Sequence, residues 1–383
     1  MPVRVAFIVG QLGLGGAEQQ LYYLLSNIDR SRFRPTVITL GRDSEEYWVQ
    51  PIKMLGTTVY HVGHSAGRLG RIAQIWSLIL SENVKIIHSW DLHTNPYVAA
   101  AGRLARVPLR LGSMRLNYYG IPNERLLRWI AFRGLDVLVT NSATAADQVR
   151  QFGLTKADIR FVANGVPIPD ARNQVDRYRL KVELCFSERD LLIGSIGRLD
   201  VNKNHAMLLR VFAKLSERWN TLRLVIIGDG PLRVQLLAMA NDLGLGSKIC
   251  LPGAVPLAAR YLSAMEVCCL TSHTEGMPNL IMEAAAAGIP VVSTYSGGST
   301  DLIEDEVSGY LVAPNDDADM RAKIHLLLED PKRRYLMGQA GLEKMRRDFS
   351  IERMVTRMTE IYEQGLVKKG IVSAKSPVEP RVA

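Results

Sequence analysis

The sequence lacks any apolar run that approaches the roughly 20 residues of a membrane-spanning helix, although 47% of its 383 residues are hydrophobic. It also lacks a signal-peptide pattern, because the segment MPVRVAFIVG has neither a long apolar core nor a small-residue cleavage site. We therefore expect a cytoplasmic protein with no segment embedded across a membrane.

Cysteine is scarce. The four cysteines are Cys185, Cys250, Cys268 and Cys269. Their spacing does not suit a metal site, and three of them lie in or beside apolar runs. We interpret them as buried, reduced thiols, which is consistent with a cytoplasmic location.

Acidic residues are outnumbered, and the imbalance is concentrated in the first part of the chain. Residues 1–170 contain 19 Lys and Arg against 12 Asp and Glu, a net charge of +7, whereas the remainder contains 28 against 26. Excess positive charge indicates an anionic partner. No nucleic-acid-binding module and no dense Lys/Arg run is present, so we predict no nucleic acid partner. We favour peripheral contact with an anionic membrane surface.

The segment Leu116–Gly134 is the candidate for that contact, because it combines arginines with aromatic and aliphatic residues. A basic helix with an apolar face can lie in a membrane interface. A helix that packs on a protein core has the same composition, so both interpretations stay open.

The length predicts two domains. Apolar runs with strand character alternate with helical patterns in both halves of the chain, which predicts an α/β fold with mostly parallel sheets covered on both faces. We place the domains at residues 1–170 and 171–350, followed by a helix over 351–366 and a flexible basic tail over 367–383.

A glycine-rich turn, GQLGLGGAE, follows the first apolar run, Val3–Val9, and leads into a predicted helix over Ala17–Asn27. The dinucleotide-binding spacing is absent because Glu18 occupies the place of its third glycine. The pair Gly15 and Gly16 would let backbone approach a phosphate or sugar closely. A tight turn that serves the fold alone is an equal alternative.

Ligands of parallel sheets gather at the carboxyl ends of the strands. Two further strand ends in the first half carry polar residues, in HSWDLHTN and in SMRLN. They make His93, Arg115 and Asn117 candidates for contact with a sugar or an acceptor.

Two acidic residues, Glu275 and Glu283, flank the start of a short alanine-rich helix in the second half. Backbone N–H groups at a helix N-terminus favour an anion, and carboxylates accept hydrogen bonds from hydroxyls. The stretch therefore suits a ligand with both phosphate and hydroxyl groups. Its predicted contacts are Glu275, Gly276, Met277, Pro278, Asn279, Leu280 and Glu283. The alternative is that either acid merely complements the helix dipole.

A second strand-to-helix loop, GRLDVNKNH, follows the apolar run Leu191–Ser195 and supplies Gly197, Arg198 and Lys203. Arginine can bind a diphosphate through two hydrogen bonds and lysine adds a point charge. The alternative is a solvated loop. Asp317 and Asp319 form a D-x-D pattern, which we interpret as a helix cap, and we predict no metal site.

These elements together resemble the retaining glycosyltransferases of family 4. The resemblance covers nearly the whole chain and is weakest over residues 40–130 and in the tail. The motifs that carry it are GGAE at Gly15–Glu18, NGV at Asn164–Val166, GRLDxxKN at Gly197–Asn204, GDGP at Gly228–Pro231, EGMPNLIME at Glu275–Glu283, AAGIPVV at Ala286–Val292 and GG at Gly297–Gly298.

The resemblance implies a GT-B fold, in which two Rossmann-like domains face a central cleft and a C-terminal helix crosses back to the first domain. It assigns Arg198 and Lys203 to the donor diphosphate, Glu283 to the ribose hydroxyls and Glu275 to the donor sugar. It also implies that the amides of Met277–Leu280 meet phosphate and that those of Gly15–Gly16 close the site from the first domain. Many relatives have a histidine where this chain has Ser113, Met114 and Arg115.

The sequence thus predicts a metal-independent, retaining glycosyltransferase with Glu275, Arg198 and Lys203 as its catalytic residues. It would move a sugar from a nucleotide-diphosphate sugar to a hydroxyl of a lipid-linked or glycan acceptor, in the biosynthesis of cell-surface polysaccharide or glycolipid. No cofactor is expected. The alternatives are a sugar-nucleotide epimerase of the same fold and a non-catalytic nucleotide-sugar-binding partner in a glycan-assembly complex.

Overall fold

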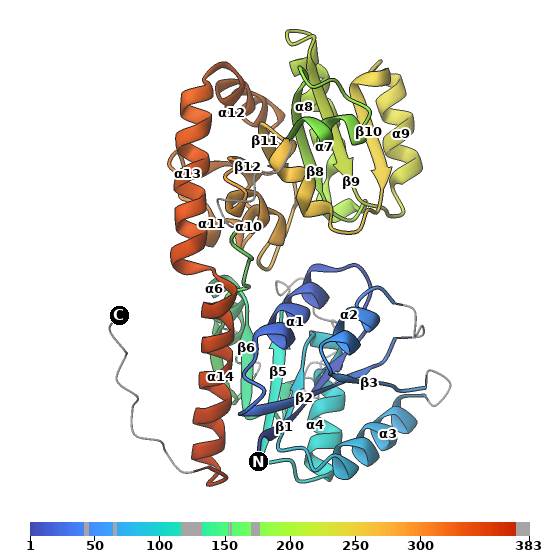
Figure 1. The fold of residues 1–383 in the computed structure, drawn as a ribbon, viewed down its shortest axis with the longest axis vertical. Coiled ribbons are helices and arrows are strands. Elements are labelled where there is room, and N and C mark those ends of the chain that lie inside the picture. Colours follow the sequence, from blue (N-terminus) through green and yellow to red (C-terminus); the bar gives the residue numbers. More distant parts are fainter. Residues whose placement is uncertain are drawn as a thin grey trace. The chain divides into compact units, whose positions relative to one another are not determined.

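A computed structural model describes residues 1–41, 46–63, 67–115, 132–151, 153, 155–169 and 177–372. The chain forms two compact units, drawn in Figure 1. Unit 1 comprises Met1–Asn141, Ala145–Ala163 and Ile351–Ala383, and unit 2 comprises Ser142–Thr144 and Asn164–Ser350. The predicted boundary at 170/171, Asn117, most of the candidate membrane helix and most of the predicted tail lie outside the described residues.

Unit 1 is built on a sheet of seven parallel strands in the order β3-β2-β1-β4-β5-β6-β7. Its central strands are runs of valine, isoleucine and other apolar residues because helices cover both faces of the sheet. The strands are β1 (Val3–Val9), β2 (Phe33–Thr39), β3 (Thr58–His61), β4 (Ile86–Ser89), β5 (Leu109–Met114), β6 (Val137–Thr140) and β7 (Asp158–Phe161).

Helices of unit 1 pack on the two faces of this sheet and form one apolar cluster on each face. One cluster includes residues of α1 (Gly16–Asn27), α2 (Val49–Met54) and α14 (Ile351–Lys368), and the other includes residues of α3 (Gly67–Ser81), α4 (Asn95–Leu104) and α6 (Ala143–Gln151). A short 3-10 helix, η2 (Leu92–Thr94), precedes α4.

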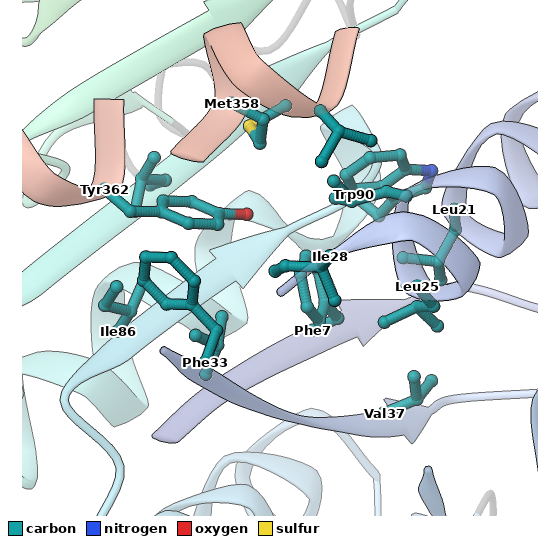
Figure 2. Packing of buried hydrophobic residues seen from close by; sticks show 14 of the residues in the cluster. Phe7, Leu21, Leu25, Ile28, Phe33, Val37, Ile86, Trp90, Met358 and Tyr362 are labelled. Atoms are coloured by element: carbon teal, nitrogen blue, oxygen red, sulfur yellow. The ribbon is translucent and has the colours of Figure 1, made fainter. Parts of the chain in front are cut away.

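The helix α14 completes the first of these clusters. Its residues Met358 and Tyr362 are fully buried against the sheet of unit 1, and the ring centroid of Tyr362 lies 5.7 Å from that of Phe33 (Figure 2). The prediction that the C-terminal helix returns to the first domain is therefore confirmed, and the helix extends to Lys368 instead of Leu366.

Unit 2 repeats the design with six parallel strands in the order β10-β9-β8-β11-β12-β13. The strands are β8 (Leu191–Ile196), β9 (Leu222–Ile227), β10 (Ile249–Gly253), β11 (Val267–Leu270), β12 (Val291–Thr294) and β13 (Gly309–Val312). The α-helices are α7 (Arg177–Glu183), α8 (His205–Ser216), α9 (Arg233–Asp242), α10 (Asn279–Ala286), α11 (Ser299–Leu302), α12 (Asp317–Glu329) and α13 (Pro331–Asp348). The 3-10 helices are η4 (Val201–Lys203), η5 (Gly246–Lys248) and η6 (Ala258–Ala264). Two Rossmann-like α/β units are the predicted fold class, which is confirmed.

Two local predictions are wrong. Cys185 is exposed and Cys250 is only half-buried; Cys185 follows the last turn of α7 in a left-handed conformation, between the buried Leu184 and Phe186. The cap of α12 is Asp316, whose carboxylate accepts a hydrogen bond from the Asp319 backbone N–H, whereas the Asp317 side chain pairs with Arg210. Neither of the two D-x-D aspartates is thus the capping residue.

Candidate functional site

The predicted donor-binding residues of unit 2 come from two turns that lie at the same edge of its sheet. Strands β8 and β11 are parallel neighbours, with Ile193 opposite Val267 and Gly194 opposite Cys268. The turns that follow them, over residues 197–204 and 271–278, therefore leave the carboxyl edge side by side. We name them the β8 turn and the β11 turn.

An ion pair joins these turns. Lys203 Nζ donates to Glu275 Oε1 at 2.5 Å, and the side chains are only 24% and 13% exposed. The lysine is placed by η4, whose N-cap Asp200 accepts a hydrogen bond from the Lys203 backbone N–H at 3.2 Å. Two of the three predicted catalytic residues thus lie together, and their opposite charges partly compensate each other.

The third predicted catalytic residue, Arg198, faces outward. Its side chain is 71% exposed, and its Nε lies 3.5 Å from an Asp200 carboxylate oxygen. A pair this exposed holds its members weakly, so the guanidinium retains the freedom to bind an anion. The neighbouring Gly197 keeps the strand-end backbone in register, since its N–H donates to the Ile227 carbonyl at 2.9 Å.

The helix α10 starts immediately after the β11 turn. Pro278 is its N-cap residue and provides no side-chain cap, while Met277, Pro278 and Leu280 are buried. Asn164 holds this start in place: its Nδ2 donates to the Met277 carbonyl at 3.3 Å and to Asn279 Oδ1 at 2.8 Å. The backbone that the sequence predicts to meet phosphate is therefore held by long-range contacts within unit 2.

A third segment supports the β11 turn from the opposite side. The Glu275 backbone N–H donates to the Ser296 carbonyl at 2.5 Å, and the Gly298 N–H donates to the Glu275 carbonyl at 3.3 Å. A Cβ atom on Gly298 would lie 1.8 Å from the Gly276 carbonyl oxygen, so only glycine fits there. Gly276 is buried by this approach.

Glu283, the predicted ribose ligand, lies on α10 with its side chain half-buried. Its charge is close enough to Cys268 to contribute to the high pKa of that thiol, although burial is the main cause. Glu283 therefore lies close to β11, the strand that precedes the turn of Glu275.

The carboxyl edge of the unit 1 sheet carries the other predicted contacts. Glu18 folds back over the first turn of α1, so that a Cβ on Gly15 would lie 2.1 Å from its Oε2. Burial raises the pKa of Glu18. The Glu18 carboxylate thus lies against the turn of Gly15 and Gly16, whose predicted contact with a donor stays a prediction.

Next to this turn lie Asp91, His93 and Arg115. The Asp91 carboxylate accepts hydrogen bonds from the Gly10 backbone N–H at 2.9 Å and from the Thr94 backbone N–H at 3.0 Å, which makes it a structural clasp. His93 is exposed on η2. The Arg115 guanidinium carbon lies 3.8 Å from the ring centroid of Trp90. Burial lowers the pKa of Arg115 to about 10.

His88, which precedes these residues on β4, has a structural role. Its ring is completely buried, with Nδ1 at 2.8 Å from Tyr362 Oη and Nε2 at 3.1 Å from Ser113 Oγ. Burial, with a smaller contribution from the Arg115 charge, lowers its pKa to about 3. A neutral imidazole therefore connects α14 to β5.

No metal or membrane signal emerges from these residues. In the described part of the chain, no three His, Cys, Asp or Glu side chains gather in a way that would hold a metal ion. Among the same described residues, no helix has the length and apolar character that crossing a bilayer requires.

Family models match both halves of the chain. The model described as "Glycosyltransferase Family 4" matches residues 14–168, and the model described as "Glycosyl transferases group 1" matches residues 176–344. Together they cover most of unit 1 before α14 and most of unit 2.

Curated relatives carry glycosyltransferase names. The lipopolysaccharide core biosynthesis glycosyltransferase LpsD of Rhizobium meliloti is 25% identical over 364 residues, covering 93% of this chain and 97% of its own. A Campylobacter jejuni enzyme, N-acetylgalactosamine-N,N'-diacetylbacillosaminyl-diphospho-undecaprenol 4-alpha-N-acetylgalactosaminyltransferase, is 30% identical, but the match covers 58% of each chain.

Solved structures share the fold. Anabaena Alr3699/HepE in complex with UDP-glucose superimposes with a TM-score of 0.81 at 19% identity, covering 94% of this chain and 99% of that one. A glycosyltransferase from Rickettsia africae gives a TM-score of 0.79 at 19% identity, covering 95% and 99%.

Proposed function

Because the chain belongs to the family 4 type of glycosyltransferases, we propose that it transfers a sugar from a nucleoside diphosphate to a hydroxyl of a lipid-linked or glycan acceptor, with retention at the anomeric carbon and without a metal ion. The observation that carries this proposal is the ion pair of Lys203 and Glu275, at adjoining ends of β8 and β11 and beside the start of α10. It combines a cation for phosphate with a carboxylate for sugar hydroxyls.

The proposed chemistry follows from the charges. Breaking the bond between the anomeric carbon and the diphosphate leaves negative charge on the phosphate oxygens. Lys203, Arg198 and the amides at the start of α10 would stabilise that charge electrostatically, which is the task a divalent cation performs in other transferases. Glu275 would then be released from Lys203 by the incoming diphosphate and accept hydrogen bonds from the donor sugar. We assign it a positioning role and not that of the attacking nucleophile.

The acceptor class is proposed from the relatives. The names of similar enzymes refer to lipopolysaccharide core and to diphospho-undecaprenol glycans. A lipid-linked acceptor fits the net positive charge of the first 170 residues, which would favour the anionic inner face of a cell membrane. Flotation of the purified chain with vesicles of phosphatidylcholine, with or without phosphatidylglycerol, tests this membrane contact. An equal bound fraction on the two kinds of vesicle would contradict it.

Donor use is testable with the purified chain. A thermal-shift panel of UDP-, GDP- and ADP-sugars identifies the nucleotide, and radiolabelled donor with a bacterial lipid extract measures transfer in the presence and absence of EDTA. We expect Lys203→Ala and Glu275→Gln to lower the rate by about 100-fold or more. The control is Lys214→Ala on α8, whose ammonium pairs only with the exposed Glu217 among the described contacts and should leave the rate unchanged.

The same assay separates the alternatives. An epimerase would convert donor without the extract, and a non-catalytic partner would release no nucleoside diphosphate under any condition. Full transfer by Lys203→Ala, or loss of transfer in EDTA with recovery on adding Mg²⁺, would contradict the proposed mechanism. The anomeric configuration of the product, measured by NMR, tests retention.

A further inference from the structure

The β8 turn and the β11 turn are joined by more than the ion pair. The His273 backbone N–H donates to the Asn202 carbonyl at 2.8 Å, and Thr271 Oγ1 donates to the Lys203 carbonyl at 2.8 Å. These contacts link residues that are about 70 positions apart in the sequence, so they form only when the sheet brings the two turns together.

The side chain of Asn202 provides the densest part of this connection. Its Oδ1 accepts hydrogen bonds from the Thr274 backbone N–H at 3.1 Å and from Thr274 Oγ1 at 2.9 Å, and its Nδ2 donates to the Thr274 carbonyl at 2.8 Å. One carboxamide thus satisfies all three polar groups of Thr274. A carboxamide is suited to this because it both donates and accepts from a single planar group.

Each member of this contact is the chain neighbour of a predicted catalytic residue. Asn202 directly precedes Lys203, and Thr274 directly precedes Glu275. A shift of Thr274 relative to Asn202 would therefore move the backbone from which the Glu275 carboxylate reaches the Lys203 ammonium, 2.5 Å away.

We propose that Asn202 is a positioning residue, whose carboxamide fixes the β11 turn against the β8 turn so that Glu275 meets the donor sugar while Lys203 meets its diphosphate. This inference rests on the proposed function. It goes beyond it by giving a role to a residue that contacts no reacting group. Reactions that depend on aligned groups lose about 100-fold when a group moves by about 1 Å.

The two turns do not depend equally on Asn202. The Lys203 backbone keeps its own anchors, the Asp200 cap and the bond from Thr271. The β11 turn keeps Ser296 and Gly298 as anchors on its other side, and the side chains of Thr271 and Glu275 still bond to Lys203. It loses all three hydrogen bonds between Asn202 and Thr274, the residue directly before Glu275. We therefore expect Asn202→Ala to displace Glu275 more than Lys203, and to affect the sugar more than the nucleotide.

The experiment compares Asn202→Ala, Asn202→Asp and the matched control Asn220→Ala in the full chain. Asn220 is exposed just before β9, at the amino edge of the sheet and thus at the opposite end of the strands from both turns. Calorimetry with UDP measures nucleotide binding, and initial rates with the UDP-sugar preferred in the donor panel give kcat and KM. Thermal unfolding checks that each variant is folded.

We expect Asn202→Ala to lower kcat by about 10- to 100-fold while UDP affinity changes by less than about 3-fold. Asn202→Asp still accepts both bonds from Thr274 but sets a carboxylate oxygen against the Thr274 carbonyl where a donor stood, so it should restore only part of the lost rate. In a Glu275→Gln background, Asn202→Ala should lower kcat by less than about 3-fold, because the carboxylate that Asn202 positions is already absent.

Three results would overturn the inference. These are a kcat for Asn202→Ala equal to that of Asn220→Ala, an equal loss in the Glu275→Gln background, and a loss of UDP binding that matches the loss of rate. A wild-type chain that binds no nucleotide and turns over no donor refutes the proposed function instead, and the inference with it. The wild-type measurement therefore separates the two failures.

Discussion

Protonation of His88 offers the sharpest test of how unit 1 is held together. The imidazole is fully buried, and hydrogen bonds connect it to Tyr362 on α14 and to Ser113 on β5. Its pKa is lowered from 6.5 to about 3, first by burial and then by the positive charge of Arg115. The perturbation is therefore a change of pH, compared in the wild type and in His88→Asn.

The sign and size of the effect follow from the two pKa values. In the unfolded chain His88 binds a proton below about pH 6.5, whereas in the folded chain it stays neutral down to about pH 3. The unfolded state is thus favoured as the pH falls through this window. At pH 5 the loss relative to pH 7.5 is about 2 kcal/mol. Glu18 and Asp91, whose pKa values burial raises, act in the opposite direction, so the comparison with His88→Asn is needed to isolate the histidine.

Native-state hydrogen exchange of the amides in β4 and β5 measures the free energy of opening of unit 1 at each pH. The difference between the wild type and His88→Asn should shrink by about 2 kcal/mol from pH 7.5 to pH 5. The matched control is His205→Asn in unit 2, where burial, and secondarily the Lys203 charge, lower the pKa of His205 to about 4. It should alter the pH dependence of β8 amides and leave those of β4 unchanged.

A wild type and a His88→Asn variant with parallel pH profiles would refute this reasoning. A difference in opening free energy that is the same at every pH would reflect only the change in side-chain packing. The reasoning would also be refuted if His205→Asn changed the pH dependence of the opening free energy of β4 amides. The two histidines would then act on one cooperative unit.

Three further predictions follow from the contacts. Gly298→Ala should lower stability by about 1–3 kcal/mol in urea unfolding and weaken UDP binding, because its Cβ would lie 1.8 Å from a carbonyl oxygen. Tyr362→Phe leaves a buried imidazole nitrogen without its hydroxyl partner, so hydrogen exchange should show about 1–3 kcal/mol lost in unit 1 and none in unit 2. A thiol reagent should modify the exposed Cys185 in the native protein but reach Cys269, whose pKa burial raises to about 12, only after unfolding; fast modification of Cys269 would contradict the buried assignment.

Strands could be located from the sequence where they form long apolar runs. The apolar runs of the central strands, such as β1 and β11, are continuous because both sheet faces are covered, so periodicity locates them. The edge strand β7, with charged residues at Asp158 and Arg160, lacks that run and was not predicted. The short β13 was missed too, since its four residues, GYLV, are too few to show a strand periodicity.

The candidate site divides in the same way. Lys203 and Glu275 were predicted from motif residues, and the order of β8 and β11 brings them together. The supporting contacts of Asn202 and Asn164 join residues 72 and 115 positions apart, and no local pattern encodes such partners. His88 drew attention as part of a polar strand end, but only its burial against Tyr362 reveals a structural role.

The position of α14 in the chain has a consequence for biosynthesis. Unit 1 buries Met358 and Tyr362 as part of its apolar interior, yet the ribosome makes these residues after the whole of unit 2. Folding during translation ordinarily proceeds from the N-terminus. Here unit 2 can complete its fold first, while unit 1 still exposes the apolar surface that α14 will cover. A nascent chain stalled near residue 350 should therefore bind chaperones through its first half, and release should coincide with the emergence of the final helix.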